Sequence, residues 1–116
     1  MNVTRFDTAP EYFPADHERM RCLRLQGKEA GPASHLWLGA SLIEPGGSTS
    51  FSAASVEKHY VVLEGEIQVR TEGGLVTLRR FDSCRLAPGE RRALFNASNE
   101  AAIVLLAMPL DTVGAR

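Results

Sequence analysis

The sequence predicts an all-β protein, either a sandwich or a barrel, and two observations support this fold class. Short runs of β-branched and apolar residues recur along the 116 residues, and turn residues such as Gly, Pro and Asn separate them at close intervals. No segment has a convincing helical periodicity, so about nine short strands account for the chain. With a hydrophobic content of 44%, a chain of this length fits one globular domain with a modest core.

The expected strands are short runs separated by turn residues. A first strand over 19–25 precedes a loop that contains Gly and Pro, and a second strand covers 35–43. The sequence Glu44-Pro-Gly-Gly has turn chemistry, so we expect it to end the second strand. The segment 48–56 is small and polar, which predicts an extended stretch with free space beside it. The remaining expected strands cover 58–64, 67–71, 75–78, 81–86, 93–96 and 101–108.

The middle of the chain contains a corner and a hairpin. The apolar runs 61–63 and 67–69 flank Gly65, where the chain must bend between two half-buried strands. Farther on, Glu72-Gly73-Gly74 predicts a hairpin that joins the strands on either side.

The two ends of the chain differ in composition from its centre. Residues 1–18 mix Pro and acidic residues with Tyr12 and Phe13, so they predict an arm whose aromatic side chains pack on the barrel or on a partner subunit. The barrel domain is expected over 19–110, and 111–116 are expected to form a frayed C-terminal tail.

Charge and hydropathy exclude several functions. The formal net charge is −1 with both signs interspersed, which gives no basic face for nucleic acid. The longest apolar run, 101–108, is too short to span a membrane, and no secretion leader is evident. Cys22 and Cys84 are far apart and not part of a disulfide-rich pattern, so we expect a reducing, cytoplasmic location.

Two spaced motifs resemble those of a small single-domain cupin. The first extends from Glu44-Pro-Gly-Gly to Gly65 and includes Tyr60-Val-Val-Leu-Glu-Gly-Glu, and the second includes Ala87-Pro-Gly and ends at Asn96. Fifteen residues separate Gly65 from Phe81, which is the compact spacing of that family. The resemblance implies a cupin double-stranded β-helix, which is a jelly-roll barrel, with the N-terminal arm in front of it.

The resemblance also implies four positions for metal ligands, usually three His and one Glu. In this sequence they are occupied by Ser52, Ala54, Lys58 and Arg92. A catalytic metal site needs several neutral imidazoles or carboxylates that converge on one point, and two cationic side chains would repel the ion. We therefore expect no metal and no cofactor.

The same two cations favour an anion inside the barrel, such as a carboxylate. Because side chains two apart on a strand share a face, Tyr60 is expected to point inward with Lys58. We therefore predict a pocket for a small organic anion, in which Arg92 holds a carboxylate and Lys58 or Tyr60 transfers a proton. The candidate catalytic residues are Lys58, Tyr60 and Arg92, and the candidate ligand-binding residues are Ser52 in the cavity, Glu57 at its rim and Asn96.

Two function classes stay open. One is a metal-independent enzyme, such as an isomerase, decarboxylase or lyase, that acts on a carboxylate-type metabolite. The other is a non-catalytic cupin with a ligand-binding, sensory or structural role. A metal relocated to Glu57, His59 and either His17 or His35 is a third, weaker alternative because these residues have no ligand spacing.

The other histidines and the tryptophan have ordinary structural interpretations. His59 is expected to face outward, His17 and His35 to be surface residues, and Trp37 to belong to the core or to an interface. A homodimer is expected, because the aromatic arm has no evident place in a monomeric core.

Overall fold

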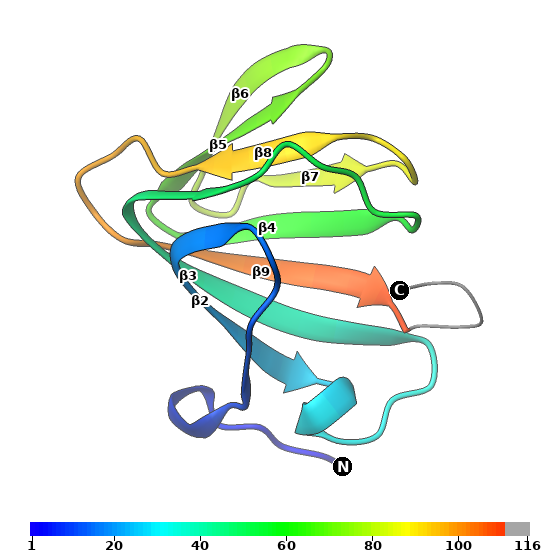
Figure 1. The fold of residues 1–116 in the computed structure, drawn as a ribbon. Helices are drawn as coiled ribbons and strands as arrows, with labels where there is room; N and C mark the ends of the chain where they lie inside the picture. The colour runs from blue at the N-terminus through cyan, green and yellow to red at the C-terminus, as the bar shows by residue number, and fades with distance from the viewer. Residues whose placement is uncertain (111–116) are drawn as a thin grey trace.

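A computed structural model describes residues 1–110 of the chain as an all-β barrel (Figure 1). Its strands are β1 (Glu11–Tyr12), β2 (His17–Gln26), β3 (Leu36–Thr49), β4 (Lys58–Glu64), β5 (Glu66–Thr71), β6 (Gly74–Arg79), β7 (Ser83–Leu86), β8 (Arg92–Phe95) and β9 (Ala102–Pro109). Two short 3₁₀ turns, η1 (Phe6–Thr8) and η2 (Lys28–Ala30), are the helical elements of the described part. The predicted tail, 111–116, lies outside the described residues.

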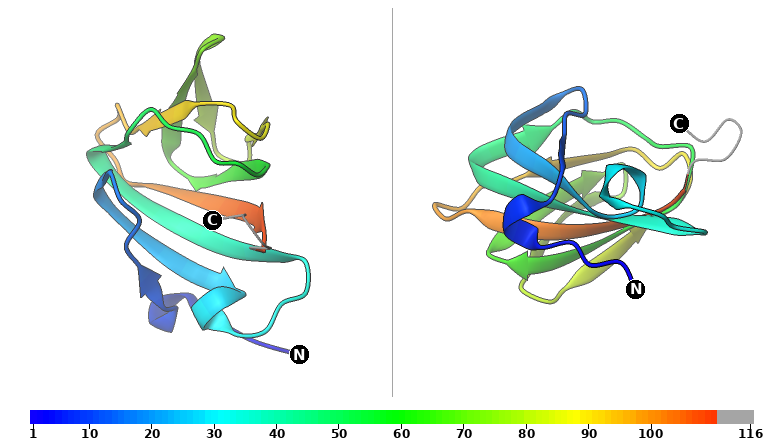
Figure 2. Two further views of the ribbon diagram at one scale, coloured as in Figure 1. Left: turned by 45° about the vertical axis from the view of Figure 1, so that its right-hand side comes forward. Right: turned by 90° about the horizontal axis from the view of Figure 1, so that it is seen from below.

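All the strands belong to one curled antiparallel sheet. Its order is β6-β5-β8-β3-β9-β4-β7, and β2 pairs with β3 while β1 pairs with β2. β6, at one end of this order, also contacts β4 near the other end, so the sheet is nearly closed. The views in Figure 2 show the two layers that result, with β5, β6 and β8 on one side and β2, β3 and β9 on the other. This confirms the jelly-roll barrel.

The predicted end of the second strand is wrong, because β3 continues through Glu44-Pro-Gly-Gly to Thr49. Up to Ile43 the strand pairs with β9, and at Ser48 it pairs with β8. Between these points Gly46 adopts a φ of 81°, and a Cβ on Gly47 would lie 2.6 Å from a backbone oxygen. The turn residues therefore bend one long strand from the first layer into the second.

Other elements differ from the prediction by a few residues. The first long strand begins at His17 because Arg19, with a φ of 56°, forms an irregularity inside it instead of preceding it. The hairpin is confirmed as β5 and β6, with Thr71 paired to Gly74 across the turn.

No helix in the described part of the chain is long and apolar enough to cross a membrane.

The core fills the space between the two layers. Fully buried apolar side chains come from strands of both layers, for example Ile43 on β3, Val62 on β4 and Ile67 on β5. On β4 and β5 they alternate with less buried residues, as the period of two requires. At one end of the barrel polar side chains enter the interior, and Thr49 and Arg92 are buried there.

The N-terminal arm packs on the same end, where Tyr12 lies beside these polar side chains. β1 pairs with β2, and the ring of Tyr12 meets Trp37 edge to face, with 5.7 Å between the ring centroids. The guanidinium carbon of Arg24 lies 3.6 Å from the Tyr12 ring centroid and 4.4 Å from that of Trp37, so Arg24 contacts both rings. Phe13, by contrast, is 83% exposed.

Candidate functional site

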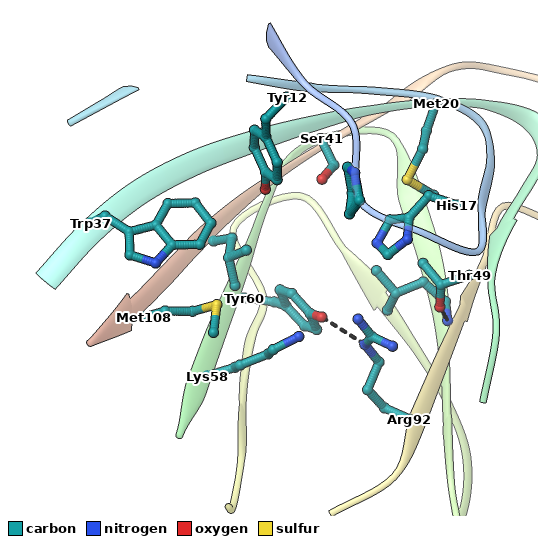
Figure 3. A pocket seen from close by; sticks show the side chains of 13 residues that line it. Tyr12, His17, Met20, Trp37, Ser41, Thr49, Lys58, Tyr60, Arg92 and Met108 are labelled. Atoms are coloured by element: carbon teal, nitrogen blue, oxygen red, sulfur yellow. Dashed lines mark hydrogen bonds between the residues drawn. The ribbon is translucent and has the colours of Figure 1, made fainter. Parts of the chain in front are cut away.

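The polar end of the barrel contains a cavity of about 170 Å³ (Figure 3). Side chains from β1, β2, β3, β4, β8 and β9 meet there, so the site is built from both ends of the chain. The lining residues are Tyr12, Pro14, His17, Met20, Trp37, Ser41, Thr49, Lys58, Tyr60, Arg92, Leu94, Leu106 and Met108.

Strand β4 presents alternate side chains to this cavity. Lys58 and Tyr60 point inward, and Val62 continues the same face into the core. His59 lies between them on the opposite, exposed face. β4 is held on both sides, because Tyr60 is paired with Cys84 of β7 and with Leu106 of β9. The cavity wall that carries the lysine and the tyrosine is therefore an interior strand of the sheet.

Arg92 begins β8 and enters the cavity from the opposite layer. It is only 5% exposed, and its backbone exchanges two hydrogen bonds with Ser52. The side-chain Nε donates to the Tyr60 hydroxyl at 2.8 Å, whereas Nη1 makes only long contacts with Ser50 O at 3.5 Å and Ser52 Oγ at 3.4 Å. Among residues 1–110, none accepts a hydrogen bond from Nη2, so the guanidinium keeps donor capacity for a ligand.

The cavity has positive charge and no carboxylate. Neither Asp nor Glu is among its lining residues, and within the described chain no carboxylate oxygen lies within 4 Å of Lys58 Nζ or of the Arg92 guanidinium. Buried charges in proteins are normally paired, because removal from water costs several kcal/mol per ion. A cationic pair without a protein counter-ion is thus the outstanding electrostatic feature of this site.

Burial and the neighbouring charge change the acidity of the lining groups. Burial, and then the positive charge of Arg92, lower the pKa of Lys58 to about 8. Burial raises the pKa of Tyr60, and the charge and hydrogen bond of Arg92 oppose this shift. The pKa of His17 is lowered mainly by burial, with smaller contributions from Arg92 and Lys58. His17 Nδ1 lies 2.7 Å from the Ala15 carbonyl oxygen, which can only accept, so Nδ1 carries the proton.

These residues do not fit the metal that cupins usually hold. Of the four positions at which the resemblance implies ligands, two carry a hydroxyl and a methyl group, Ser52 and Ala54, and two carry the cations Lys58 and Arg92. Within residues 1–110, no three His, Cys, Asp or Glu side chains come together as a metal-binding group. The relocated metal considered above finds no such group either, because His17 lines the cavity while Glu57 and His59 lie on the outer face of the sheet.

The three predicted ligand-binding residues lie at different places. Ser52 accepts the long contact from Arg92 but is exposed and does not line the cavity. Glu57 is not at the rim: it contacts His59 on the outer face, with Nε2 to Oε2 at 2.5 Å, and pairs with Arg85 at 3.1 Å. Its side chain points away because it shares the face of His59.

Asn96 has a structural position. Its side chain is fully buried, and Nδ2 donates to the carbonyls of Ile43 at 3.0 Å and Glu100 at 2.8 Å. Oδ1 accepts from the Ser98 backbone and hydroxyl, so the amide has no hydrogen-bonding capacity left for a ligand. The residue ties the corner of β3 to the turn that follows β8.

Among the lining residues that sequence reasoning did not assign to the site, three carry an aromatic or imidazole ring. His17, expected on the surface, is half-buried in the cavity wall, and Tyr12 and Trp37 form its aromatic side. The aromatic composition of the arm was the available signal. What the sequence alone did not supply is the pairing of β1 with β2 and of β2 with β3, which carries the arm to the cavity.

Comparison with known proteins gives a family and a fold. The family profile described as Cupin domain (Cupin_2) matches residues 40–108. The chain is 38% identical over 106 residues to a protein of Mycobacterium tuberculosis named beta-D-galactosidase Rv1717, and the match covers 91% of each chain.

Two solved structures show how widely the barrel is shared. The polyketide cyclase RemF from Streptomyces resistomycificus superimposes with a TM-score of 0.85 at 16% identity, over 96% of this chain and 80% of the other. A sugar phosphate isomerase of the cupin superfamily from Silicibacter pomeroyi gives 0.78 at 18% identity, over 92% and 74%. At these identities the likeness concerns the fold alone.

Proposed function

We propose, from the premise that this chain belongs to the Cupin_2 family of cupin domains, that its barrel cavity binds a small organic anion of the carboxylate type without a metal ion. The single observation that carries this proposal is Arg92, which is buried among lining residues that include a second cation and no carboxylate. An anionic ligand would supply the missing counter-charge, and guanidinium groups bind carboxylates with two parallel hydrogen bonds.

The size and shape of the cavity narrow the ligand. A cavity of about 150 Å³ holds a benzene ring, so about 170 Å³ accommodates a metabolite of similar or slightly larger size. One side of the cavity is polar, with Lys58 and Arg92, and the other is apolar, with Trp37 and Met108 (Figure 3). The ligand would direct its carboxylate to the cations and its carbon skeleton to the apolar side.

If the protein is an enzyme, the same groups support reactions that build up negative charge. Isomerisation, decarboxylation and lyase reactions pass through enolate-like states, and two fixed cations would stabilise such a state in a partly dry site. Tyr60 and Lys58 are the proton carriers closest to that charge. A non-catalytic cupin would use the cavity only to hold the anion. Lys58→Met distinguishes the enzyme from the non-catalytic protein. The variant would abolish turnover in an enzyme, and it would only weaken affinity for the anion in a binding protein.

The relative named beta-D-galactosidase supplies a second candidate, hydrolysis of a β-galactoside. Glycoside hydrolysis ordinarily uses two carboxyl groups that flank the scissile bond. The cavity lining has none, and Glu57 faces the other side of β4. The geometry therefore favours an anionic ligand over a β-galactoside. Because the relative is 38% identical to this chain, the experiment below also includes galactosides.

Trp37 provides the test, because it lines the cavity and is the single tryptophan of the chain. Its fluorescence is titrated with sodium L-lactate and sodium galactonate, and with galactose and lactose as neutral sugars, all at constant ionic strength. We expect a saturable change with a carboxylate and none with the neutral sugars. A saturable response to galactose or lactose, with no response to either carboxylate, would overturn the proposal in favour of the galactoside.

The expected homodimer and cytoplasmic location are also proposals. Phe13 is exposed although its neighbour Tyr12 packs on the barrel, which supports an arm that contacts a second copy. Light scattering on the full chain tests this, and a monomeric mass contradicts it. Cys22 and Cys84 are both free thiols, which suits a reducing compartment.

A further inference from the structure

We propose that Lys58 forms a Schiff base with an oxo acid, a small carboxylic acid that carries a ketone or aldehyde carbonyl close to its carboxylate. This inference rests on the proposed function, because it uses the same cavity and the same carboxylate contact. It adds a covalent step and narrows the ligand from carboxylates in general to those with a reactive carbonyl group.

The first argument is the surroundings of the amine. A lysine becomes nucleophilic when it is desolvated and lies near a second cation, because both conditions favour its neutral form. Lys58 meets both: it lies in the cavity wall, close enough to Arg92 to be affected by its charge, and without a carboxylate of the described chain within 4 Å. An ordinary binding lysine would be paired or exposed to solvent.

The second argument is that the carboxylate and the carbonyl would reach different groups. Arg92 has free donor capacity at Nη2, whereas its Nε is already used by Tyr60. Lys58 lies two residues from Tyr60 on the same face of β4, so its Cα is about 7 Å from that of Tyr60. Figure 3 shows the end of the Lys58 side chain directed toward Tyr60 and Arg92. A ligand with adjacent carboxylate and carbonyl groups can thus contact both cations at once.

Tyr60 supplies the proton transfers of this step. Its oxygen accepts from Arg92 Nε, so its own proton remains available to the cavity. The neutral amine adds to the carbonyl carbon, and the C–N bond forms as the carbonyl electron pair moves to oxygen. Tyr60 protonates that oxygen and takes a proton from nitrogen, which gives the carbinolamine. The C–O bond then breaks, water leaves with a further proton from Tyr60, and the nitrogen lone pair forms the iminium. Solvent returns that proton, so amine, carbonyl and one proton become iminium and water.

Carboxylate binding does not remove the reactivity of the amine. A carboxylate on Arg92 would neutralise the smaller of the two causes that lower the Lys58 pKa, while burial, the larger cause, remains. The other titratable groups of the cavity are His17, Tyr12 and Tyr60. The pKa of His17 lies below its usual value and those of both tyrosines above theirs. A rate of adduct formation that changes near pH 8 would therefore report the ionisation of Lys58.

The chain is well suited to a trapping experiment, because Lys28 and Lys58 are its only lysines. The full-length protein is incubated with sodium pyruvate and sodium borohydride, and the reduced adduct is located by peptide mass spectrometry. We expect one adduct per chain on Lys58, in at least about tenfold excess over Lys28 and the N-terminal amine, with a rate that rises as the pH passes about 8. Acetone, which has the carbonyl without the carboxylate, should label Lys58 at least about tenfold less.

One variant and one non-reactive ligand separate the possible failures. Lys58→Arg keeps the charge without the primary amine, so it should give no adduct. Wild-type protein that binds both lactate and pyruvate but yields no adduct would overturn the Schiff base and leave the proposed function intact. If neither ligand binds, the proposed function fails as well. Equal labelling of Lys28 and Lys58 would show ordinary amine reactivity and would also overturn the inference. This comparison uses the wild-type protein alone, so it does not depend on whether a variant folds.

Discussion

The two faces of strand β4 use similar residues in opposite ways. On the inner face, Lys58 and Tyr60 meet Arg92, and no carboxylate of the described chain pairs with either cation. On the outer face, Glu57 and His59 meet Arg85, and the carboxylate contacts both partners. Each cluster combines two residues that are two apart in the segment 57–60 with one arginine of a neighbouring segment. The inner cluster is less exposed to solvent and has no carboxylate, whereas the outer cluster contains its own.

This difference shows which charges deserve a functional interpretation. Exposed ion pairs such as the outer cluster contribute little to stability and occur on most protein surfaces. A buried cation without a counter-ion costs free energy in the absence of a ligand, so a folded protein that keeps one gains something from it elsewhere. The comparison therefore predicts that changes on the inner face alter binding, and that matched changes on the outer face do not.

The largest effect is expected from Arg92→Gln. Loss of the guanidinium removes the buried carboxylate contact, which is worth about 2–5 kcal/mol when one partner of such a pair is truncated, so affinity for L-lactate should fall roughly 30-fold or more. Arg85→Gln is the matched control, because it removes the same charge from the outer face. Trp37 fluorescence measures both. Equal losses in the two variants would mean that net charge, and not the cavity, attracts the anion.

Lys58→Met is expected to weaken lactate binding less than Arg92→Gln does, and to increase the stability of the ligand-free protein. Lactate affinity should fall about tenfold with the loss of one cation. The free energy of unfolding at pH 7 should rise by about 1–2 kcal/mol, because a partly buried charge is replaced by an apolar side chain of similar length. Thermal unfolding of the ligand-free proteins measures the second effect, with His59→Gln as the outer-face control. A destabilised Lys58→Met would show that the ammonium group is well accommodated and contradict the comparison.

Much of the inner face could be predicted because it depends on a local rule. Strand alternation places Lys58 and Tyr60 together, and the spacing of the second motif brings Arg92 to the same cavity. The same rule, applied to Glu57, assigns it to the outer face with His59. Its expected place at the rim disagrees with this rule, because residues adjacent along a strand point to opposite faces.

The remaining parts of the site depend on long-range pairing that a sequence pattern does not specify. The irregularity at Arg19 interrupts the alternation of β2, which hid His17 from the strand prediction. Tyr12 reaches the cavity only because β1 adds to the edge of β2. Asn96 matches its motif position, yet its amide is fully used by Ile43 of β3 and by Ser98 and Glu100 in the turn after β8, which becomes apparent only when the turn contacts are known.

The pH dependence of stability sharpens the comparison further. The pKa of Lys58 is about 8 in the folded state and about 10.5 in the unfolded chain. Between these values the unfolded state binds more protons, so the contribution of Lys58 to stability rises with pH from about 8 to about 10.5 and is at its least favourable below 8. The advantage of Lys58→Met should therefore shrink over this window.

NMR of the protein with ¹³C-methylated amines measures the ionisation directly, and Lys58→Arg assigns the resonance against Lys28. Bound lactate should raise the Lys58 pKa, because an anion favours the charged form. An unshifted Lys58 resonance with and without lactate would contradict both the burial and the anion contact.

The smallest effect is expected on the outer face itself, from Glu57→Gln. The carboxylate is held by His59 and Arg85, and these contacts lower its pKa, but the group is exposed to solvent that screens them. We therefore expect no measurable change in lactate affinity and no measurable change in melting temperature at pH 7. A loss of lactate binding comparable to that of Arg92→Gln would show that β4 transmits charge changes between its faces, and the inner cluster could then not be treated as a separate site. Retained binding, with Arg92→Gln impaired, would locate anion recognition on the inner face alone.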